Sequence, residues 1–189
     1  MNAKKLAILI SGKGTNAKRL IQFKSLAECT QFLIISSKCN DIMRLYCEKN
    51  DIFYFEIEGA TENLNKQIEC IFEEHLVTHV VLAGFLKKIS SSTVCAFQGR
   101  MLNLHPSLLP KFGGSGMYGR RVHQAVFDAG EVKTGITIHE VSEIYDEGKI
   151  IAQFEVSISE LDSVSKIEEK VRQLEKKYFP EIVWKFITE

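Results

Sequence analysis

The sequence has none of the features that place a protein in a membrane or outside the cell. Its longest early apolar run, residues 6–10, is too short for a signal-peptide core or a membrane span. The five cysteines form no Cys-x-x-Cys pair, and their number is odd. Without a secretion signal, this pattern indicates reduced thiols and no disulfide framework. We therefore expect a cytoplasmic protein.

An excess of charge of either sign is also missing. The 24 lysines and arginines balance 24 aspartates and glutamates, so the formal net charge is +0 at pH 7. Chains that bind nucleic acid usually carry a basic excess, and acidic tails mark disordered partner segments. We accordingly expect small molecules as partners, with no nucleic acid and no membrane, and a monomer or weak homodimer.

Proline is scarce too, and low-complexity tracts and internal repeats are absent. With three prolines in 189 residues, no shift in composition marks a linker. A hydrophobic content of 45% and a charged content of 25% are ordinary for a globular protein. We therefore expect residues 1–189 to form one domain.

What the sequence does contain is an alternation of short apolar runs with longer mixed segments. The apolar runs predict buried strands, and the segments between them predict helices. The expected strands are residues 6–10, 32–35, 52–55, 79–83 and 101–105, and the expected helices are residues 16–24, 41–49, 62–75 and 91–97. This repetition predicts a doubly wound α/β fold with a mainly parallel sheet and right-handed crossovers.

Beyond residue 110 the pattern changes. A glycine-rich loop at 111–119 precedes a predicted helix at 121–129. Two strand-like runs, 135–141 and 149–158, are close enough to pair as a late antiparallel hairpin. Ser165 and Glu168 have the spacing of a capping box, which predicts a C-terminal helix from there to about residue 178. Pro180 suits the first turn of a last short helix through residue 184.

The segment 102–110 combines an apolar strand with two polar side chains and ends in a stretch with two prolines. Asn103 and His105 are two residues apart, so they project from the same face of the strand. An amide and an imidazole together can stabilise charge on a carbonyl oxygen while protons move. The pair falls at the carboxyl end of a strand, where α/β sheets bind ligands. This position favours a functional site over a core histidine with an asparagine that satisfies backbone groups.

A second candidate site lies between the first expected strand and the first expected helix. Its two glycines allow the backbone to approach a ligand, and the helix N-terminus favours an anion. The Walker A spacing is missing, and the segment 36–38 has no acid where a dinucleotide site needs one. A tight turn capped by asparagine remains an alternative. The favoured prediction is a phosphate-binding loop made of Gly12, Lys13, Gly14, Thr15 and Asn16.

Two residues of the predicted hairpin are candidates for the same site as His105. Asp146 lies in the turn between the two late strands, which is a common place for aspartate. Beside His105 it would favour the imidazolium form and orient a water molecule for proton transfer. His139 can face the site or be a half-exposed strand residue, and the sequence does not decide between them.

Four further charged residues have simple explanations by themselves. Arg172 and Glu175 are three residues apart on the expected last long helix, which is the spacing of a surface ion pair. The alternative is an arginine for a phosphate and a carboxylate for ribose hydroxyls. Lys87 and Lys88 are most simply solvated charges.

Five segments together resemble a known family over nearly the whole chain. They are LISGKGTN (9–16), VLAGF (81–85), LNLHPSLLP (102–110), TGITIH (134–139) and DEG (146–148). This ordered set is similar to the phosphoribosylglycinamide formyltransferases, folate-dependent enzymes of purine synthesis. The resemblance implies a Rossmann-like formyltransferase fold. It also implies transfer of a formyl group from the co-substrate 10-formyltetrahydrofolate to the amine of glycinamide ribonucleotide, with no metal.

By position, the resemblance assigns the catalytic roles to Asn103, His105 and Asp146. The substrate amine would attack the formyl carbon directly. Asn103 and a protonated His105 would stabilise the oxyanion. Asp146 would support His105 and help a water molecule carry the proton from the amine to the folate nitrogen.

The resemblance also divides the binding residues between two halves of the chain, 1–105 for the nucleotide and 106–189 for the folate side. The loop Gly12–Asn16 and Arg172 would hold the substrate phosphate, and Glu175 would hold the ribose. The residues implied to contact the folate are Phe85, Leu86, Lys87, Lys88, Ile89, Glu140, Glu143 and Tyr145, with Lys87 near the glutamate tail.

The chain departs from the family pattern at three places, on the folate side or in the loop over the substrate. Glu147 and Lys149 replace the usual glycine and proline around the catalytic aspartate, and Glu140 stands where an aromatic residue is common. The segment 112–123 is also richer in glycine and basic residues. Two alternatives remain: a hydrolase resembling formyltetrahydrofolate deformylase, and a non-catalytic module that binds nucleotide phosphate.

Overall fold

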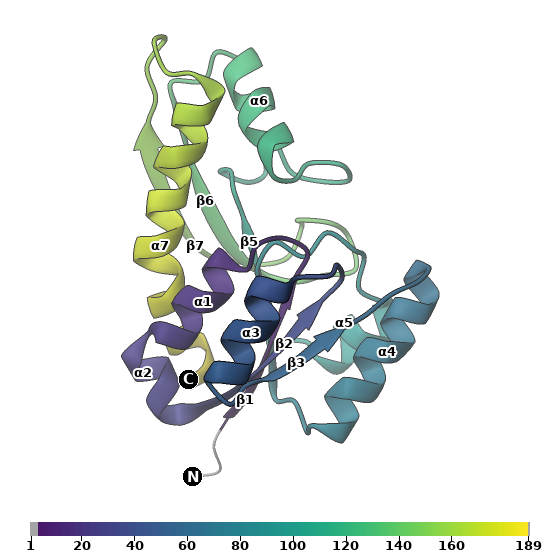
Figure 1. The fold of residues 1–189 in the computed structure, drawn as a ribbon. Coiled ribbons are helices and arrows are strands. Elements are labelled where there is room, and N and C mark those ends of the chain that lie inside the picture. The colour runs from purple at the N-terminus through teal and green to yellow at the C-terminus, as the bar shows by residue number, and fades with distance from the viewer. Residues whose placement is uncertain (1–3, 189) are drawn as a thin grey trace.

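The computed structural model describes residues 4–188, apart from the side chains of Leu26 and Cys29 (Figure 1). One seven-stranded sheet runs through the molecule in the order β3-β2-β1-β4-β5-β6-β7. Its strands are β1 (Lys4–Ile10), β2 (Thr30–Ser36), β3 (Phe53–Glu56), β4 (His79–Leu82), β5 (Met101–His105), β6 (Lys133–Glu140) and β7 (Ile150–Ser157). The first five strands are parallel, and β6 and β7 are antiparallel to their neighbours. This arrangement confirms the predicted sheet.

Helices cover both faces of the sheet, as Figure 1 shows. One core contains residues of α1, α3 and α7, and the other contains residues of α4 and α5. The helices are α1 (Thr15–Gln22), α2 (Lys24–Cys29), α3 (Asp41–Lys49), α4 (Thr61–Glu74), α5 (Ser91–Ala96), α6 (Arg120–Asp128) and α7 (Val164–Thr188). The doubly wound architecture is therefore confirmed.

The apolar run in β1 is continuous because both faces of that strand are buried. Leu6, Ile8 and Ile10 point into the core under α1, α3 and α7, whereas Ala7 and Leu9 point into the core under α4 and α5. Each of these side chains is fully buried. Complete burial of one leucine or isoleucine contributes roughly 1.5–3 kcal/mol to stability. A central strand of a covered parallel sheet shows this sequence pattern.

The strand order places a crevice at the carboxyl ends of the central strands β1 and β4. From β1 the chain winds outward to β3 on one side, and then crosses to β4 on the other side of β1. Loops that leave β1 and β4 therefore run in opposite directions, and ligands bind in the gap between such loops. A hydrogen bond from Ser11 N to Gly84 O, 3.0 Å long, joins the two strand ends there.

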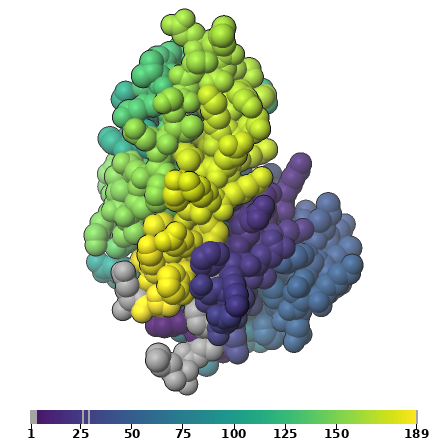
Figure 2. All heavy atoms as spheres, turned by 90° about the vertical axis from the view of Figure 1, so that its left-hand side faces the viewer, coloured from purple at the N-terminus to yellow at the C-terminus, as the bar shows by residue number. Residues whose placement is uncertain are grey.

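The C-terminal region differs from the prediction. The expected helix to residue 178 and the expected short helix after Pro180 form one 25-residue helix, α7. Pro180 and Phe179 are buried in the core, so packing against the sheet offsets the hydrogen bond that proline cannot donate. The capping box at Ser165 is also wrong, because Ser163 Oγ accepts from Lys166 N and caps the helix. Figure 2 shows α7 along the surface beside α1 and α2.

The first predicted helix is also divided. Residues 16–24 were expected to be one helix, whereas α1 ends at Gln22 and α2 begins at Lys24. Phe23 adopts an extended conformation, with φ −76° and ψ 111°, and packs its ring against the core. The gain from burying this ring outweighs the continuation of the helix.

Two expectations about the environment of the chain can be compared with the structure. The four cysteines whose side chains are described, Cys39, Cys47, Cys70 and Cys95, are free thiols. Within residues 4–188, no helix is both long and apolar enough to cross a lipid bilayer.

His79 is a buried histidine at the start of β4, and it makes the fold sensitive to acid. Burial lowers its pKa to about 4, and the charges of Lys4 and Arg100 act in the same direction. An unfolded chain has this pKa near 6.5, so the unfolded state binds more protons between these two values. The folded state is therefore destabilised as the pH falls from 6.5 towards 4.

Replacing His79 by glutamine should remove this acid sensitivity. From the two pKa values, acidification from pH 7.5 to pH 5 costs the native protein about 2 kcal/mol at this site. The loss in free energy of unfolding between these pH values, measured by urea titration, should be smaller by that amount in His79→Gln. An unchanged loss would show that His79 is not the group responsible.

Candidate active site

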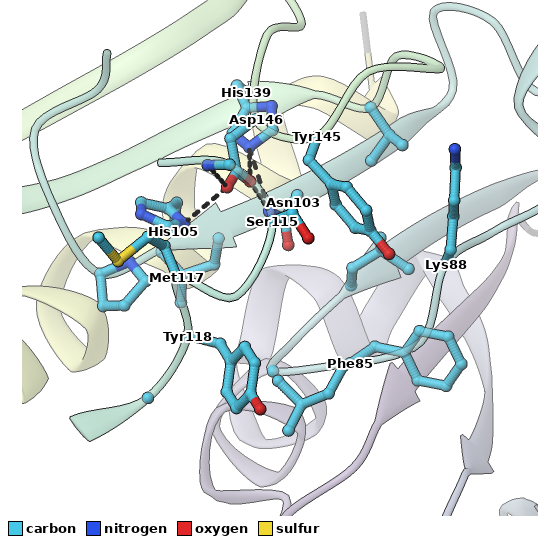
Figure 3. A pocket seen from close by; sticks show the side chains of 18 of the residues that line it. Phe85, Lys88, Asn103, His105, Ser115, Met117, Tyr118, His139, Tyr145 and Asp146 are labelled. Carbon is cyan, nitrogen blue, oxygen red and sulfur yellow. Dashed lines mark hydrogen bonds and ion pairs between the residues drawn. The ribbon is translucent and has the colours of Figure 1, made fainter. Parts of the chain in front are cut away.

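A cavity of about 510 Å³ lies at the carboxyl ends of β4 and β5 (Figure 3). The loop after β4, the loop before α6 and the turn between β6 and β7 form three of its walls. Residues of α6 and α7 and the start of α1 form the remaining wall. The cavity therefore lies at the carboxyl ends of the strands, next to the gap between the loops that leave β1 and β4.

The structure brings Asp146 next to His105, although they are 41 positions apart in the sequence. The distance between His105 Nδ1 and Asp146 Oδ2 is 3.4 Å. Asn103 Nδ2 donates to Asp146 Oδ1 at 3.3 Å, so one carboxylate contacts both polar residues of β5. Figure 3 shows this carboxylate between the two side chains. The spatial cluster that the sequence could only suggest is therefore present.

His139 completes this cluster. It is directly opposite Asn103 in the antiparallel pairing of β5 with β6. Its Nδ1 donates to Glu140 O at 2.8 Å, because a carbonyl can only accept. Its Nε2 lies 3.1 Å from Asn103 Nδ2 and 3.5 Å from Asp146 Oδ1. This orientation settles that His139 faces the site and is not half-exposed.

The backbone around Asp146 is specialised for its position. Asp146 has a φ of +59°, in the left-handed region that favours glycine, asparagine and aspartate. Its Oδ2 accepts from Gly114 N at 2.9 Å, which attaches the glycine-rich loop to the carboxylate. At Gly148 a Cβ atom would lie 1.7 Å from Glu140 O. Glycine at position 148 is thus required for the turn that presents Asp146.

The protonation of His105 depends on opposing effects. Burial lowers the pKa of its imidazole, while the Asp146 carboxylate and the Phe112 carbonyl raise it, and the result lies below the ordinary value. Nε2 donates to Phe112 O at 2.8 Å, because a carbonyl can only accept. Nδ1 faces Asp146 Oδ2 at 3.4 Å and is the ring nitrogen that can gain or lose a proton there.

Asp146 remains ionised in this setting. Burial raises the pKa of its carboxyl, but the His139 and His105 rings and the Gly114 N–H lower it by more. A proton that arrives at His105 Nδ1 would therefore lie between an imidazole and a carboxylate. This pair can accept a proton and keep it in place.

At one end of the cavity, polar residues of α1 and α7 meet. Asn16 Nδ2 donates to Glu175 Oε2 at 3.0 Å. Burial raises the pKa of Glu175, and the Asn16 hydrogen bond and the Arg172 charge partly oppose this. Arg172 pairs with Glu168, at 2.5 Å, and the predicted surface pair of Arg172 with Glu175 is wrong. Residues 168 and 172 have the i, i+4 spacing of a helix ion pair, and the Glu175 carboxylate is held by Asn16.

The candidate phosphate loop contributes less of the cavity wall than the sequence suggested. Asn16 lines the cavity, whereas Gly12, Lys13, Gly14 and Thr15 are not among its lining residues. Asn16 is not the helix cap; Gly14 precedes α1 with a φ of +72°. A Cβ atom on Gly14 would lie 3.0 Å from Met43 Sδ, so the packing of α3 also requires glycine there.

At the other end, basic and aromatic side chains surround the cavity. Tyr145 and Lys88 are 5.7 Å apart, measured from the ring centroid to Nζ, as a cation–π pair. Figure 3 shows these two side chains with Phe85 on the same side of the cavity. The predicted folate residues that line the cavity are Phe85, Leu86, Lys87, Lys88, Ile89, Glu143 and Tyr145.

Glu140 is the member of that predicted set that does not line the cavity. Its Oε1 lies 3.8 Å from Lys149 Nζ, and its N–H donates to Lys149 O at 2.9 Å. Backbone pairing at the end of β6 turns the Glu140 side chain towards Lys149. Two of the departures from the family pattern therefore face each other and form an ion pair.

Several lining residues were not predicted from the sequence. Ser115, Met117 and Tyr118 belong to the loop before α6 (Figure 3). His123 lies on α6 and is buried with Val122 and Val126. A histidine on the apolar face of a short helix was the only sequence signal for it.

Comparison with known proteins agrees with this geometry. Residues 4–183 match the family described as Formyl transferase. The chain belongs to the formyl transferase family. Within it, the chain is similar to the phosphoribosylglycinamide formyltransferase of Haemophilus influenzae, with 31% identity over 98% of this chain and 88% of that protein.

Two further relatives support this family assignment. The chloroplastic phosphoribosylglycinamide formyltransferase of Arabidopsis thaliana is 35% identical over 95% of this chain. This chain spans 64% of that relative's length, which is less than two thirds. The crystal structure of phosphoribosylglycinamide formyltransferase from Bacillus halodurans has a TM-score of 0.87 and 30% identity, and covers 98% of this chain and 96% of its own. The family and the Rossmann-like fold expected from the motifs are thereby confirmed.

Proposed function

We propose that this formyl transferase family member transfers the formyl group of 10-formyltetrahydrofolate to the amine of glycinamide ribonucleotide. The observation that carries the proposal is the cluster of Asn103, His105 and Asp146 in the cavity wall. His105 Nδ1 and Asn103 Nδ2 both lie within 3.4 Å of one carboxylate. An amide donor, an imidazole and a carboxylate in contact suit the stabilisation of an oxyanion and the movement of a proton.

The reaction forms one carbon–nitrogen bond, breaks another and moves one proton. The substrate amine attacks the formyl carbon, and the formyl oxygen becomes an oxyanion. Asn103 Nδ2 is an amide donor for that oxygen once it exchanges its 3.3 Å contact with Asp146. Asp146, with His105, holds the water that takes the amine proton and delivers it to the folate nitrogen as the carbon–nitrogen bond breaks. Between the two transfers His105 Nδ1 can hold that proton as an imidazolium, and it returns the proton through the water to the folate nitrogen.

The two ends of the cavity suit the two substrates. At the nucleotide end we assign the phosphate to the N-terminus of α1 with Gly12, Lys13, Gly14, Thr15 and Asn16, together with Arg172. Glu175, whose carboxylate accepts from Asn16, is the acceptor for the ribose hydroxyls. The aromatic and basic residues from Phe85 to Ile89, with Tyr145, suit the planar ring system and the anionic tail of the folate.

The proposal also covers the division of the chain, its location, its oligomeric state and its partners. Residues 1–105 supply the nucleotide side, and residues 106–189 supply the folate side. The protein acts in the cytoplasm as a monomer or weak homodimer. Its partners are the two small substrates, and the reaction requires no covalent attachment of the formyl group to the protein.

One assay tests the function directly. The protein is mixed with 10-formyltetrahydrofolate, with or without glycinamide ribonucleotide, and the folate and formylated nucleotide are quantified. We expect folate release only with the nucleotide, and one formylated nucleotide per folate released. Folate release without the nucleotide would identify a deformylase-like hydrolase. Nucleotide binding without any turnover would identify a non-catalytic phosphate-binding module.

A further inference from the structure

His123 is a buried histidine without a partner in the wall of the cavity. Its side chain belongs to α6, and only 4% of the residue is exposed. Within residues 4–188, its Nδ1 is buried and has no hydrogen-bond partner. Buried polar atoms without partners are rare in native proteins, because they lower stability. An isolated histidine at this place therefore calls for an explanation outside the packing of α6.

The charged groups around His123 do not supply a hydrogen bond to its Nδ1. Burial lowers its pKa, and the charges of Arg172, His105 and Arg120 act in the same direction, while Glu168 raises it. Glu168 is the acid whose charge acts on His123, but its carboxylate already pairs with Arg172 at 2.5 Å. The pKa of His123 is thus held below its ordinary value, and the charged groups that act on it include both His105 of the catalytic cluster and Arg172 of the nucleotide end.

The two ring nitrogens of His123 have different environments. Nδ1 is enclosed by protein and has no partner among the described residues, which is not so for Nε2. His123 also lines the cavity. The ring edge with Nε2 is therefore the edge that a ligand can reach. Two arginines, Arg121 and Arg172, line the same cavity. Cationic and N–H donors in a partly buried wall suit an anionic oxygen ligand.

We propose that His123 donates a hydrogen bond from Nε2 to a phosphate oxygen of the nucleotide substrate, and so selects for phosphorylated substrates. This inference rests on the function proposed above. A phosphate monoester carries a charge of roughly −1.5 to −2 at pH 7. That charge beside the ring favours the imidazolium form, and the group of His123 and Arg172 then faces a ligand of opposite charge. The proposed contact is made by Nε2, and Nδ1 stays enclosed by protein.

Three substitutions separate the two ring nitrogens. In His123→Gln the amide nitrogen falls near the position of Nε2, and in His123→Asn it falls near Nδ1. His123→Leu removes both. We expect the KM for glycinamide ribonucleotide to rise about 10- to 100-fold in His123→Leu and His123→Asn, since the lost hydrogen bond involves a charged group. In His123→Gln the rise should be several-fold smaller.

The phosphate itself is tested with a second substrate, the dephosphorylated glycinamide ribonucleoside. His123→Leu should lower kcat/KM for the nucleotide by about 10- to 100-fold and for the nucleoside by no more than about 2-fold. An equal fall for both substrates would overturn the assignment to the phosphate. A larger effect on kcat than on KM would overturn a binding role.

Protein stability distinguishes a binding residue from a structural one. An apolar side chain of similar size leaves no unpaired buried nitrogen, so His123→Leu should unfold at the same or a higher urea concentration than the unaltered protein. A clear loss of stability in His123→Leu would indicate a structural role and count against the proposal. The exposed neighbour Gln124, changed to leucine, is the matched control and should leave the nucleotide KM unaltered.

The outcome is separable from that of the proposed function. If the unaltered protein does not formylate glycinamide ribonucleotide, the proposed function has failed. In that case the binding of ribose 5-phosphate, compared between the unaltered protein and His123→Leu, still tests the phosphate contact. If formylation proceeds and the nucleotide KM is the same in all three variants, only the assignment of His123 has failed.

Discussion

Replacing His105 by glutamine should lower kcat for formyl transfer by roughly 10²–10⁴-fold, the usual contribution of a general acid–base group. The amide of glutamine can still donate to Phe112 O, the contact that Nε2 makes now, so the loop before α6 should stay attached. What disappears is Nδ1, which lies 3.4 Å from Asp146 and can hold a proton there. Single-turnover kinetics with saturating substrates measures this step.

The effect should be confined to the chemical step. The KM for glycinamide ribonucleotide should change by much less than kcat, because the nucleotide end is built from α1 and α7 and not from β5. His75→Gln, the same change in a histidine outside the cavity, should leave both constants unaltered. A His105→Gln protein with the kcat of the unaltered enzyme would remove His105 from the catalytic residues.

Asp146→Asn should cause a loss of similar size, at least about 10²-fold in kcat. Asparagine tolerates the left-handed backbone at a φ of +59°, so the turn can be retained. Its amide oxygen can still accept from Gly114 N, the contact that Oδ2 makes now at 2.9 Å. The variant therefore removes the negative charge and largely preserves the geometry.

The pH profile of Asp146→Asn tests the pairing with His105. The Asp146 carboxylate raises the pKa of His105 against the effect of burial. Without that charge the pKa of His105 falls further, so the loss of activity on acidification should begin at a lower pH than in the unaltered enzyme. An acidic limb at the same pH in both proteins would show that the two residues do not titrate together.

Elements with strong local signals were predictable from the sequence. The bounds of β5 and α3 agree with the predicted residues 101–105 and 41–49, since apolar periodicity and flanking polar residues mark both. The division at Phe23 and the continuous helix through Pro180 were not predictable, because both depend on burial against the sheet. In each case tertiary packing outweighed a local preference.

The sequence by itself determined the doubly wound parallel sheet, the position of Asn103 and His105 at a strand end, and the family motifs. These follow from spacing along one strand or one helix, which short-range geometry sets. Only the tertiary structure decided that Asp146 meets His105 across 41 residues, that Glu140 faces Lys149 and not the cavity, and that His123 lines the site. Such contacts depend on sheet register and on how loops and helices pack, and no local pattern in the sequence specifies them.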